Sequence, residues 1–255
     1  MHLFIDPIAL WLVAARLSGW MMLSPGFTEI NTPQLTRAFL IVWLSYLLLP
    51  LIGPIHAPLG SWPELIVALL GEFVIGAGYG LMLRLIFGAV QFGGVLIDSE
   101  LGYLYAQQVN PYVPLSGGIF GRLFLLLAVL YFWLFDYFRV VLVALRESFV
   151  LVPIGAIGGA LFDLGLLVKM SGALFVGGLT MAAPIMALMF FVTISIGFLA
   201  RTVQGLSLFS ENFVFRIIVG LCGLVVLLPL LFLLMRIEME QILPMSSRYF
   251  KFALP

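Results

Sequence analysis

The chain has few charged residues: Asp, Glu, Lys and Arg together make up 9% of its 255 residues, against about 25% in an ordinary soluble domain. Apolar residues make up 63%, with 23 Phe and 5 Trp among the aromatic ones. A soluble fold cannot hide so much apolar surface and still present a charged exterior. The composition therefore excludes a soluble globular domain and a disordered tail, and it indicates a polytopic membrane protein.

The chain also lacks a charge of one dominant sign and a pair of cysteines. It has 12 basic and 12 acidic residues and no polybasic run, so charge implies neither nucleic acid nor an anionic lipid surface as a partner. The single cysteine, Cys222, stands in an apolar run and is expected to be a buried, inert thiol. The N-terminus has no basic region and no small-residue cleavage site, so its first apolar run is expected to be a retained span.

Motifs that carry catalytic chemistry are missing as well. The two histidines, His2 and His56, belong to no HExxH or Cys/His cluster that could hold zinc. Neither a phosphate-binding Gly-Lys-Ser/Thr motif nor Gly-x-Ser-x-Gly occurs. Asp98 and Glu100 are two residues apart, which puts them on different sides of a helix, and a solvated loop edge is expected for both. No catalytic residue, cofactor or metal is predicted, and an enzyme is disfavoured.

Apolar runs and their breakers predict six membrane-spanning helices. They cover about residues 7–23, 38–54, 64–88, 119–145, 170–200 and 214–235. The short, glycine-containing run 148–162 is predicted to be a re-entrant or interfacial piece. The predicted fold is all-α, a single membrane domain over residues 1–255.

The basic residues do not orient these spans. With six spans and the N-terminus outside, five basic residues fall on the inner side and six on the outer side, so the positive-inside rule decides nothing. A charge at the bilayer centre costs about 2.5–3.5 kcal/mol. The charged residues inside predicted spans are therefore expected to face protein or a wet cavity: Arg16, Glu72, Arg84, Asp136 and Arg139. Asp136 and Arg139 are three residues apart and can pair on one helix face.

The third predicted span carries a regular stripe of small and charged residues. It recurs every four positions as Glu72, Gly76, Gly80, Arg84 and Gly88. On a helix these positions form one slowly drifting line, and its GxxxG match permits close helix approach. Its two charged residues are 12 positions apart, about 18 Å along a helix, so each needs a partner from another segment. A helix contact inside one chain and a contact with other subunits around a pore both explain the stripe.

The segment between the third and fourth predicted spans is irregular, yet it holds no charge from Leu101 to Gly121. Its prolines remove backbone donors and its glycines allow bends. Irregular backbone is tolerated at membrane depth where it is buried in protein or lines a cavity. A channel gate or plug and a re-entrant packing loop both fit this composition. The residues concerned are Asn110, Pro111, Pro114, Gly117, Gly118 and Gly121.

Four ordered blocks of residues, from about residue 15 to residue 221, resemble one protein family. The first block holds Arg16, Ser24-Pro25, Glu29, Pro33 and Arg37; the second holds Ile75–Gly80, Gly94, Asp98, Gly102 and Asn110-Pro111. The third holds Gly121-Arg122-Leu123, Phe132, Ser148-Phe149 and Val152–Gly155; the fourth holds Ala183-Pro184, Gly197–Arg201, Leu206–Phe209 and Gly220. In order and spacing these blocks resemble the FliR family of flagellar biosynthesis proteins, to which the SctT proteins of injectisomes are related.

The resemblance implies a non-enzymatic subunit of the type III protein export gate. Members of the family form a protein-conducting channel with FliP and FliQ, built of helical hairpins, through which unfolded flagellar axial proteins are exported. The resemblance also implies FlhB and FlhA as further partners, contact with membrane lipid, no nucleic acid, and a place in the bacterial inner membrane at the flagellar basal body. It assigns the channel plug to about Ala106–Arg122, and structural roles to Arg16, Pro25, Pro33, Arg37, Arg122, Pro184, Arg201 and Phe209.

Two other classes stay open beside this one. An equivalent SctT subunit of a virulence injectisome is the alternative within the family. A small solute or ion transporter is disfavoured because neither repeated halves nor a polar midplane site is visible. The chain departs from the family pattern at Gln204-Gly205, at Asn110 and at Glu100, where the family usually has Pro-Gln, Asp and often Gln, so roles that depend on those side chains do not transfer.

Overall fold

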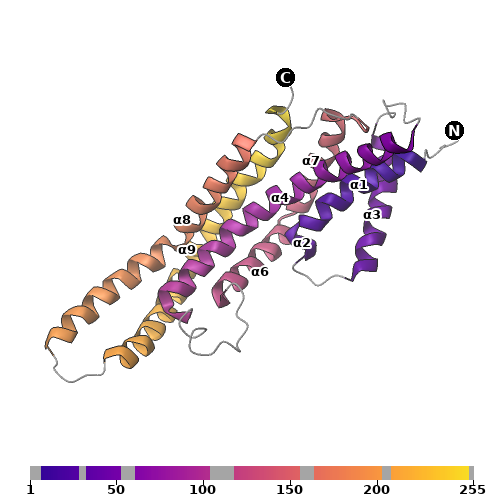
Figure 1. Ribbon diagram of the computed structural model, residues 1–255. Coiled ribbons are helices and arrows are strands. Elements are labelled where there is room, and N and C mark those ends of the chain that lie inside the picture. The colour runs from indigo at the N-terminus through magenta and orange to yellow at the C-terminus, as the bar shows by residue number, and fades with distance from the viewer. Residues whose placement is uncertain are drawn as a thin grey trace. The chain divides into compact units, whose positions relative to one another are not determined.

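The computed structural model describes residues 7–28, 33–52, 61–103, 118–155, 164–202 and 208–252 (Figure 1). Every regular element within these ranges is a helix, and no strand occurs in them. The elements are α1 (Pro7–Leu23), α2 (Pro25–Thr28), α3 (Gln34–Leu48), η1 (Leu49–Leu51), α4 (Trp62–Leu101), α6 (Ile119–Leu134), α7 (Tyr137–Leu151), α8 (Leu164–Thr202) and α9 (Leu208–Phe252). The predicted all-α fold of a polytopic membrane protein is confirmed.

Fewer helices are long enough to cross a membrane than the six spans predicted from the sequence. Each predicted apolar run overlaps a helix, but α1 and α3 have only 17 and 15 residues, and a spanning helix needs about 20. Among the described residues three helical stretches are long and apolar enough to cross a membrane, Trp62–Leu101, Val168–Phe198 and Phe215–Glu238. A fourth arises if α6 and α7 together make one bent span.

The predicted fourth span, 119–145, is not one straight helix. It breaks at Phe135-Asp136, and α6 and α7 are bent by 75° at this break. Asp136 adopts a left-handed backbone with φ 56° and ψ 23°, a conformation that Asp tolerates better than most residues. Asp136 and Arg139 are both exposed, and no ion pair joins them. The predicted pairing of these two side chains on one continuous helix is therefore wrong, because Asp136 lies at the break before α7 and has a left-handed backbone.

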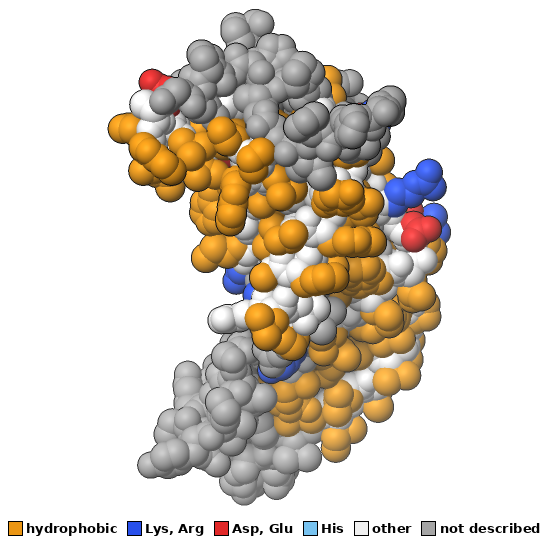
Figure 2. Space-filling view, turned by 90° about the vertical axis from the view of Figure 1, so that its right-hand side faces the viewer, with side chains coloured by type: hydrophobic (Ala, Val, Ile, Leu, Met, Phe, Trp, Pro, Cys, Tyr) orange, Lys and Arg blue, Asp and Glu red, His pale blue; other side chains and the backbone are white. Residues whose placement is uncertain are grey.

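Cys222 is exposed on α9, so the prediction of a buried thiol is wrong. Its surroundings explain the difference: neighbouring apolar residues of α9, such as Val225 and Val226, are 70% and 77% exposed. An apolar run in a membrane protein does not have to be covered by its own chain. Exposed apolar side chains are not confined to α9. Figure 2 shows hydrophobic side chains over most of the described surface on the face in view.

The chain divides into two compact units. Residues 1–85, 131–170 and 242–255 form the first unit, and residues 86–130 and 171–241 form the second. The long helices α4, α8 and α9 each contribute residues to both units. The expectation of a single domain stays a prediction.

The first unit is built around the contact between α1 and α4. Gly76 and Gly80 of α4 lie directly against the backbone of Arg16 and Trp20 of α1, so the two helices run in the same direction. Tyr79 of α4 donates a hydrogen bond of 3.3 Å to the Ala144 carbonyl of α7. Beside this contact, four rings pack in edge-to-face, stacked or tilted pairs, with centroids 4.9 to 6.3 Å apart: Trp20, Phe27, Trp133 and Phe138.

The second unit contains an antiparallel hairpin of α8 and α9. Gly177 of α8 faces Glu238 of α9, and Leu188 of α8 faces Gly223 of α9, so the two helices run in opposite directions. Helix α4 packs closely on α8 at Gly93 and Gly178. A Cβ atom on either glycine would lie closer to the other glycine's backbone than ordinary van der Waals contact allows. Glycines at these crossings let the helix backbones come close, as in membrane helix pairs.

Candidate functional site

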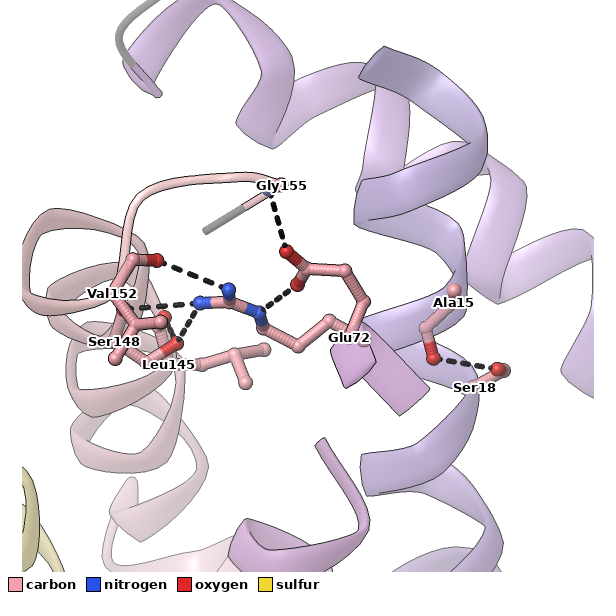
Figure 3. Close-up of polar contacts among 8 residues, drawn as sticks. Ala15, Ser18, Glu72, Leu145, Ser148, Val152 and Gly155 are labelled. Atoms are coloured by element: carbon pink, nitrogen blue, oxygen red, sulfur yellow. Dashed lines mark hydrogen bonds and ion pairs between the residues drawn. The ribbon is translucent and has the colours of Figure 1, made fainter. Parts of the chain in front are cut away.

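Arg16 is the centre of a buried polar network in the first unit (Figure 3). Its side chain is fully buried, and all three guanidinium nitrogens donate. Nε donates to Glu72 Oε2 at 2.5 Å, and one terminal nitrogen donates to the Ser148 carbonyl at 3.0 Å and to Ser148 Oγ at 3.2 Å. The other terminal nitrogen donates to the Val152 carbonyl at 3.0 Å. The guanidinium carbon also lies 4.2 Å from the centroid of the Phe149 ring, so the cation has both hydrogen-bond acceptors and an aromatic ring as neighbours.

Glu72 extends this network to the segment that follows α7. Its side chain is 3% exposed, and its second oxygen, Oε1, accepts a hydrogen bond of 3.1 Å from the Gly155 backbone N–H. Gly155 has a φ of 79°, a left-handed conformation that a glycine adopts without steric cost. The hydrogen bonds of Arg16 and Glu72 therefore join α1, α4 and the end of α7, and Figure 3 shows Glu72 pointing toward Gly155. The network fixes three helices relative to one another in one unit.

The glycines beside this network bring α1 and α4 into backbone contact. A Cβ at Gly76 would overlap the Arg16 carbonyl oxygen, and a Cβ at Gly80 would lie 2.5 Å from the Trp20 carbonyl oxygen. Gly19 of α1 makes the reciprocal approach to Phe73 of α4. The first three members of the stripe, Glu72 included, therefore contact segments of the same chain.

The last two members of the stripe are placed differently. Arg84 is exposed, and Gly88 is half-buried with Leu174 as its neighbour. No acidic side chain in the described part of the chain pairs with Arg84. A stripe with four-residue spacing turns by about 40° at each step, which carries it from the α1 contact at Gly76 to the open side of α4 at Arg84. A contact of this part of the stripe with other subunits stays a prediction.

Asp98 is fully buried and caps the start of α6. Its Oδ1 accepts hydrogen bonds of 3.1 Å from the backbone N–H groups of Ile119 and Phe120, and Oδ2 accepts one of 3.0 Å from Gly121. A carboxylate at a helix N-terminus satisfies unpaired N–H groups and complements the helix dipole. The prediction of a solvated loop edge for Asp98 is wrong, because its partners lie beyond the loop, 21 to 23 residues further on.

Two glycines make room for this cap. Gly118 has a φ of 74°, and a Cβ there would overlap the Asp98 carboxylate. Gly121 packs against Val95, and Gly94 packs against the backbone of Phe120 and Gly121. The Tyr103 ring, at the other end of the intervening loop, meets the Phe120 ring edge to face at 5.9 Å. The two ends of the loop are therefore held side by side on α4.

The remaining residues proposed for the plug lie outside the described part of the chain. These are Asn110, Pro111, Pro114 and Gly117, since the structure describes nothing between Tyr103 and Gly118. Gly118 and Gly121 are described and take part in the Asp98 cap. The assignment of a plug to about Ala106–Arg122 stays a prediction.

The other family-motif residues are scattered over the fold. Pro25 begins α2, and Pro33 precedes α3, where the missing N–H of a proline does not matter. Arg37 is half-buried in α3, Arg122 is exposed on α6, and Pro184 stands inside α8. Arg201 and Phe209 fall within the bounds of α8 and α9, and their side chains lie outside the described ones. The structure does not bring these residues together at one site.

One further ion pair was not singled out by the sequence. Arg216 of α9 donates to the Glu100 carbonyl at 2.9 Å and lies 3.4 Å from Glu100 Oε2, near the end of α4. The two residues are 116 positions apart, so no spacing rule links them. Within the described part of the chain, no group of three or more His, Cys, Asp or Glu side chains is arranged to hold a metal ion.

Comparison with known proteins adds the family. The chain is 30% identical over 220 residues to the flagellar biosynthetic protein FliR of Pectobacterium carotovorum subsp. carotovorum, covering 85% of this chain and 82% of that protein. It is 25% identical to FliR of Escherichia coli strain K12 over 87% of each chain, and 24% identical to FliR of Bacillus subtilis strain 168 over 89% of each. The family model of bacterial export proteins, family 1, matches residues 8–242.

The chain belongs to the FliR family of bacterial export proteins. The match includes most of the first compact unit, the whole of the second, and all of the helices α1 to α8 except the first residue of α1. The Arg16–Glu72 network and the Asp98 cap therefore both lie inside the region that defines the FliR family.

Proposed function

We propose that this FliR-family protein is a non-enzymatic subunit of the flagellar type III protein export gate, which forms the protein-conducting channel together with FliP and FliQ. The observation that carries the proposal is the family match over residues 8–242. The named relatives above are flagellar biosynthetic proteins, which favours the flagellar system over an SctT role in a virulence injectisome. The cargo would be the unfolded axial proteins of the growing flagellum, and FlhB and FlhA would be further partners.

Apolar surface left uncovered by the chain supports a place in a membrane assembly. Leu130 of α6 is 53% exposed, Phe190 of α8 is 61% exposed and Val226 of α9 is 77% exposed. Such side chains need lipid or another protein against them. A position in the inner membrane, at the base of the flagellum, provides both.

The loop after α4 is proposed as the plug of the closed channel. The support is its lack of charge from Leu101 to Gly121, together with the way its two ends are held on α4 by the Asp98 cap and by the contact of Tyr103 with Phe120. A loop with fixed ends can occlude a channel without loosening the helices that support it.

Co-purification with native mass determination tests the proposed function. The chain is tagged after Pro255 and extracted in mild detergent from cells that carry the neighbouring export genes. We expect a large complex that contains FliP- and FliQ-like proteins. Injectisome counterparts in their place would support the SctT alternative. A lone monomer or homodimer, from cells that do express these partners, would contradict the channel-subunit role and favour a transporter.

A further inference from the structure

Arg216 of α9 ties that helix to the end of α4 within the second unit. One terminal nitrogen of its guanidinium donates to the Glu100 carbonyl at 2.9 Å and lies 3.4 Å from Glu100 Oε2. The carbonyl groups of the last turn of a helix have no partner within the helix, and a cation beside them also complements the helix dipole. Arg216 therefore caps the C-terminal end of α4 from another helix.

The packing next to this contact fixes where α9 meets α4. Gly220 follows Arg216 by four residues, so both lie on the same face of α9. A Cβ at Gly220 would overlap the side chain of Leu101, which is fully buried at the last position of α4. The next residue, Gly102, has a φ of 86°, and its N–H donates to the Ser99 carbonyl at 3.1 Å. One face of α9 therefore lies against the last turn of α4.

Two polar contacts hold the end of α4, and they differ in strength. The Asp98 carboxylate is fully buried and accepts three hydrogen bonds from the start of α6. The side chains of Arg216 and Glu100 are 27% and 32% exposed, and partly exposed ion pairs contribute little to stability because water and salt screen them. Arg216 Nε is also buried without an acceptor among the described residues, which is unfavourable for a donor group. The contact with α9 is therefore the weaker one.

We propose that the Arg216–Glu100 contact is a releasable latch between α9 and the end of α4. When α9 moves away, the end of α4 is freed at Leu101 and Gly102, while Asp98 keeps its hold on α6. Release costs Arg216 little, because its guanidinium gains water at Nε. Arg216 is thus a positioning residue. Its effect on the channel rests on the proposed function, because the loop proposed as the plug follows the end of α4.

Amide hydrogen exchange of the purified full-length chain tests the latch itself. In Arg216→Leu we expect exchange at Leu101 and Gly102 to be about two- to fivefold faster than in the wild type, the change that loss of a partly exposed ion pair produces. Exchange over Ile119–Gly121 should not change, because the Asp98 cap is intact. Unchanged exchange at the end of α4 would overturn the latch. Equal acceleration on both sides would also overturn it, because Arg216 would then support the whole unit.

Three further variants keep this test decisive. Arg216→Lys retains the cation and should exchange nearly as the wild type does. Glu100→Gln removes the ionic partner at almost constant size but keeps the backbone carbonyl, so it should show the pattern of Arg216→Leu more weakly, and it replaces that variant if the latter does not fold. Arg236→Leu is the matched control, since Arg236 pairs with Glu240 of the same helix. It stands 20 residues beyond Arg216, about 30 Å along α9, and should leave the end of α4 unchanged.

Conductance of membranes that contain the intact complex tests the consequence for the channel. Arg216→Leu is expected to raise conductance about two- to fivefold over the wild type, and Arg236→Leu is expected to leave it unchanged. Deletion of Pro114–Gly118 should raise it further, because it removes part of the loop itself. A complex that leaks after this deletion but not with Arg216→Leu would leave the proposed function intact and overturn the latch. Failure of the chain to form a complex would contradict the proposed function, while the exchange measurement would still decide on the latch.

Discussion

At the scale of single residues, the buried charges of this protein are held by partners far away in the sequence. Arg16 was expected to face protein or a wet cavity, and it does, but its partner Glu72 is 56 residues away and Ser148 is 132 residues away. Helical spacing identifies charges that need a partner; it does not say which segment supplies it. The same limit applies to Asp98, whose partners lie across an uncharged loop.

Breaking the Arg16–Glu72 pair from one side should be costly. Removal of one partner of a buried ion pair typically costs about 3–5 kcal/mol, because the other charge stays buried without compensation. We expect Glu72→Ala to lower the melting temperature of the detergent-solubilised protein markedly. Glu240→Ala is the control: it breaks the Arg236–Glu240 pair, whose side chains are 57% and 45% exposed, and such a pair contributes about 0–1 kcal/mol. Equal melting temperatures for the two variants would contradict the role given to Glu72.

The glycines of α4 offer a matched comparison. A Cβ at Gly76 would overlap the Arg16 carbonyl oxygen, whereas a Cβ at Gly71 meets nothing within 4 Å. Gly76→Ala should therefore reduce the yield of folded protein, since the backbone of α1 has to move. Gly71→Ala should be neutral or stabilise the helix by up to about 1 kcal/mol. The measurement is the fraction of monodisperse protein after extraction, followed by thermal unfolding of what remains. A stable Gly76→Ala variant would show that α1 and α4 are not in backbone contact.

At the scale of elements, the sequence predicts where helices occur but not where they bend. The apolar runs predict α1, α3, α4, α8 and α9, because a long apolar run in a membrane protein usually forms a helix. The break between α6 and α7 was missed, since the residues around Asp136 are as apolar as a continuous span. The one local signal was Asp136 itself, a residue type that favours helix starts and tolerates a left-handed backbone. Likewise, the four-residue stripe left a contact inside the chain and a contact with other subunits both open, and the structure shows that Gly76 contacts α1 whereas Arg84 is exposed.

The Asp98 cap should determine how firmly the start of α6 is held. Asp98→Leu removes the acceptor of three backbone N–H groups and leaves them buried without partners, each at a cost of about 1–3 kcal/mol. We expect faster amide hydrogen exchange over Ile119–Gly121 and lower thermal stability. Asp98→Asn keeps one acceptor oxygen, so its exchange rates and thermal stability should lie between those of the wild type and of Asp98→Leu. Unchanged exchange at these three amides in Asp98→Leu would mean that the cap does not hold α6.

The loop itself should control leakage through the channel. Deletion of Pro114–Gly118 is expected to leave the complex assembled but to make the membrane permeable to ions or small solutes, because it removes the uncharged Pro/Gly segment proposed as the plug. The measurement is conductance of membranes that contain the complex, with recovery of the intact complex on a native gel as the control. Unchanged conductance in an intact complex would exclude the plug.

At the scale of the whole molecule, the failure of the positive-inside rule and the uncovered apolar surface have a common explanation. The rule assumes that each long apolar run is a lipid-facing span, yet only three stretches, or four with the bent pair, are long enough among the described residues. Helices α1 and α3 are too short, and exposed cations such as Arg84 and Arg122 are expensive against lipid. Both features fit a subunit whose helices pack largely against other proteins. Composition and runs of apolar residues predicted the class of protein, whereas the proposed contacts with other subunits cannot be read from the sequence of one chain.

The most direct test of the central claim is an export assay. The gene is deleted from its own organism, and the flagellar axial proteins released into the culture medium are measured before and after the wild-type gene is restored. We expect the axial proteins to disappear from the medium of the deletion strain while they are still made inside the cells, and to return with the gene. Normal release of axial proteins from the deletion strain would contradict the assignment of this protein to the flagellar export gate.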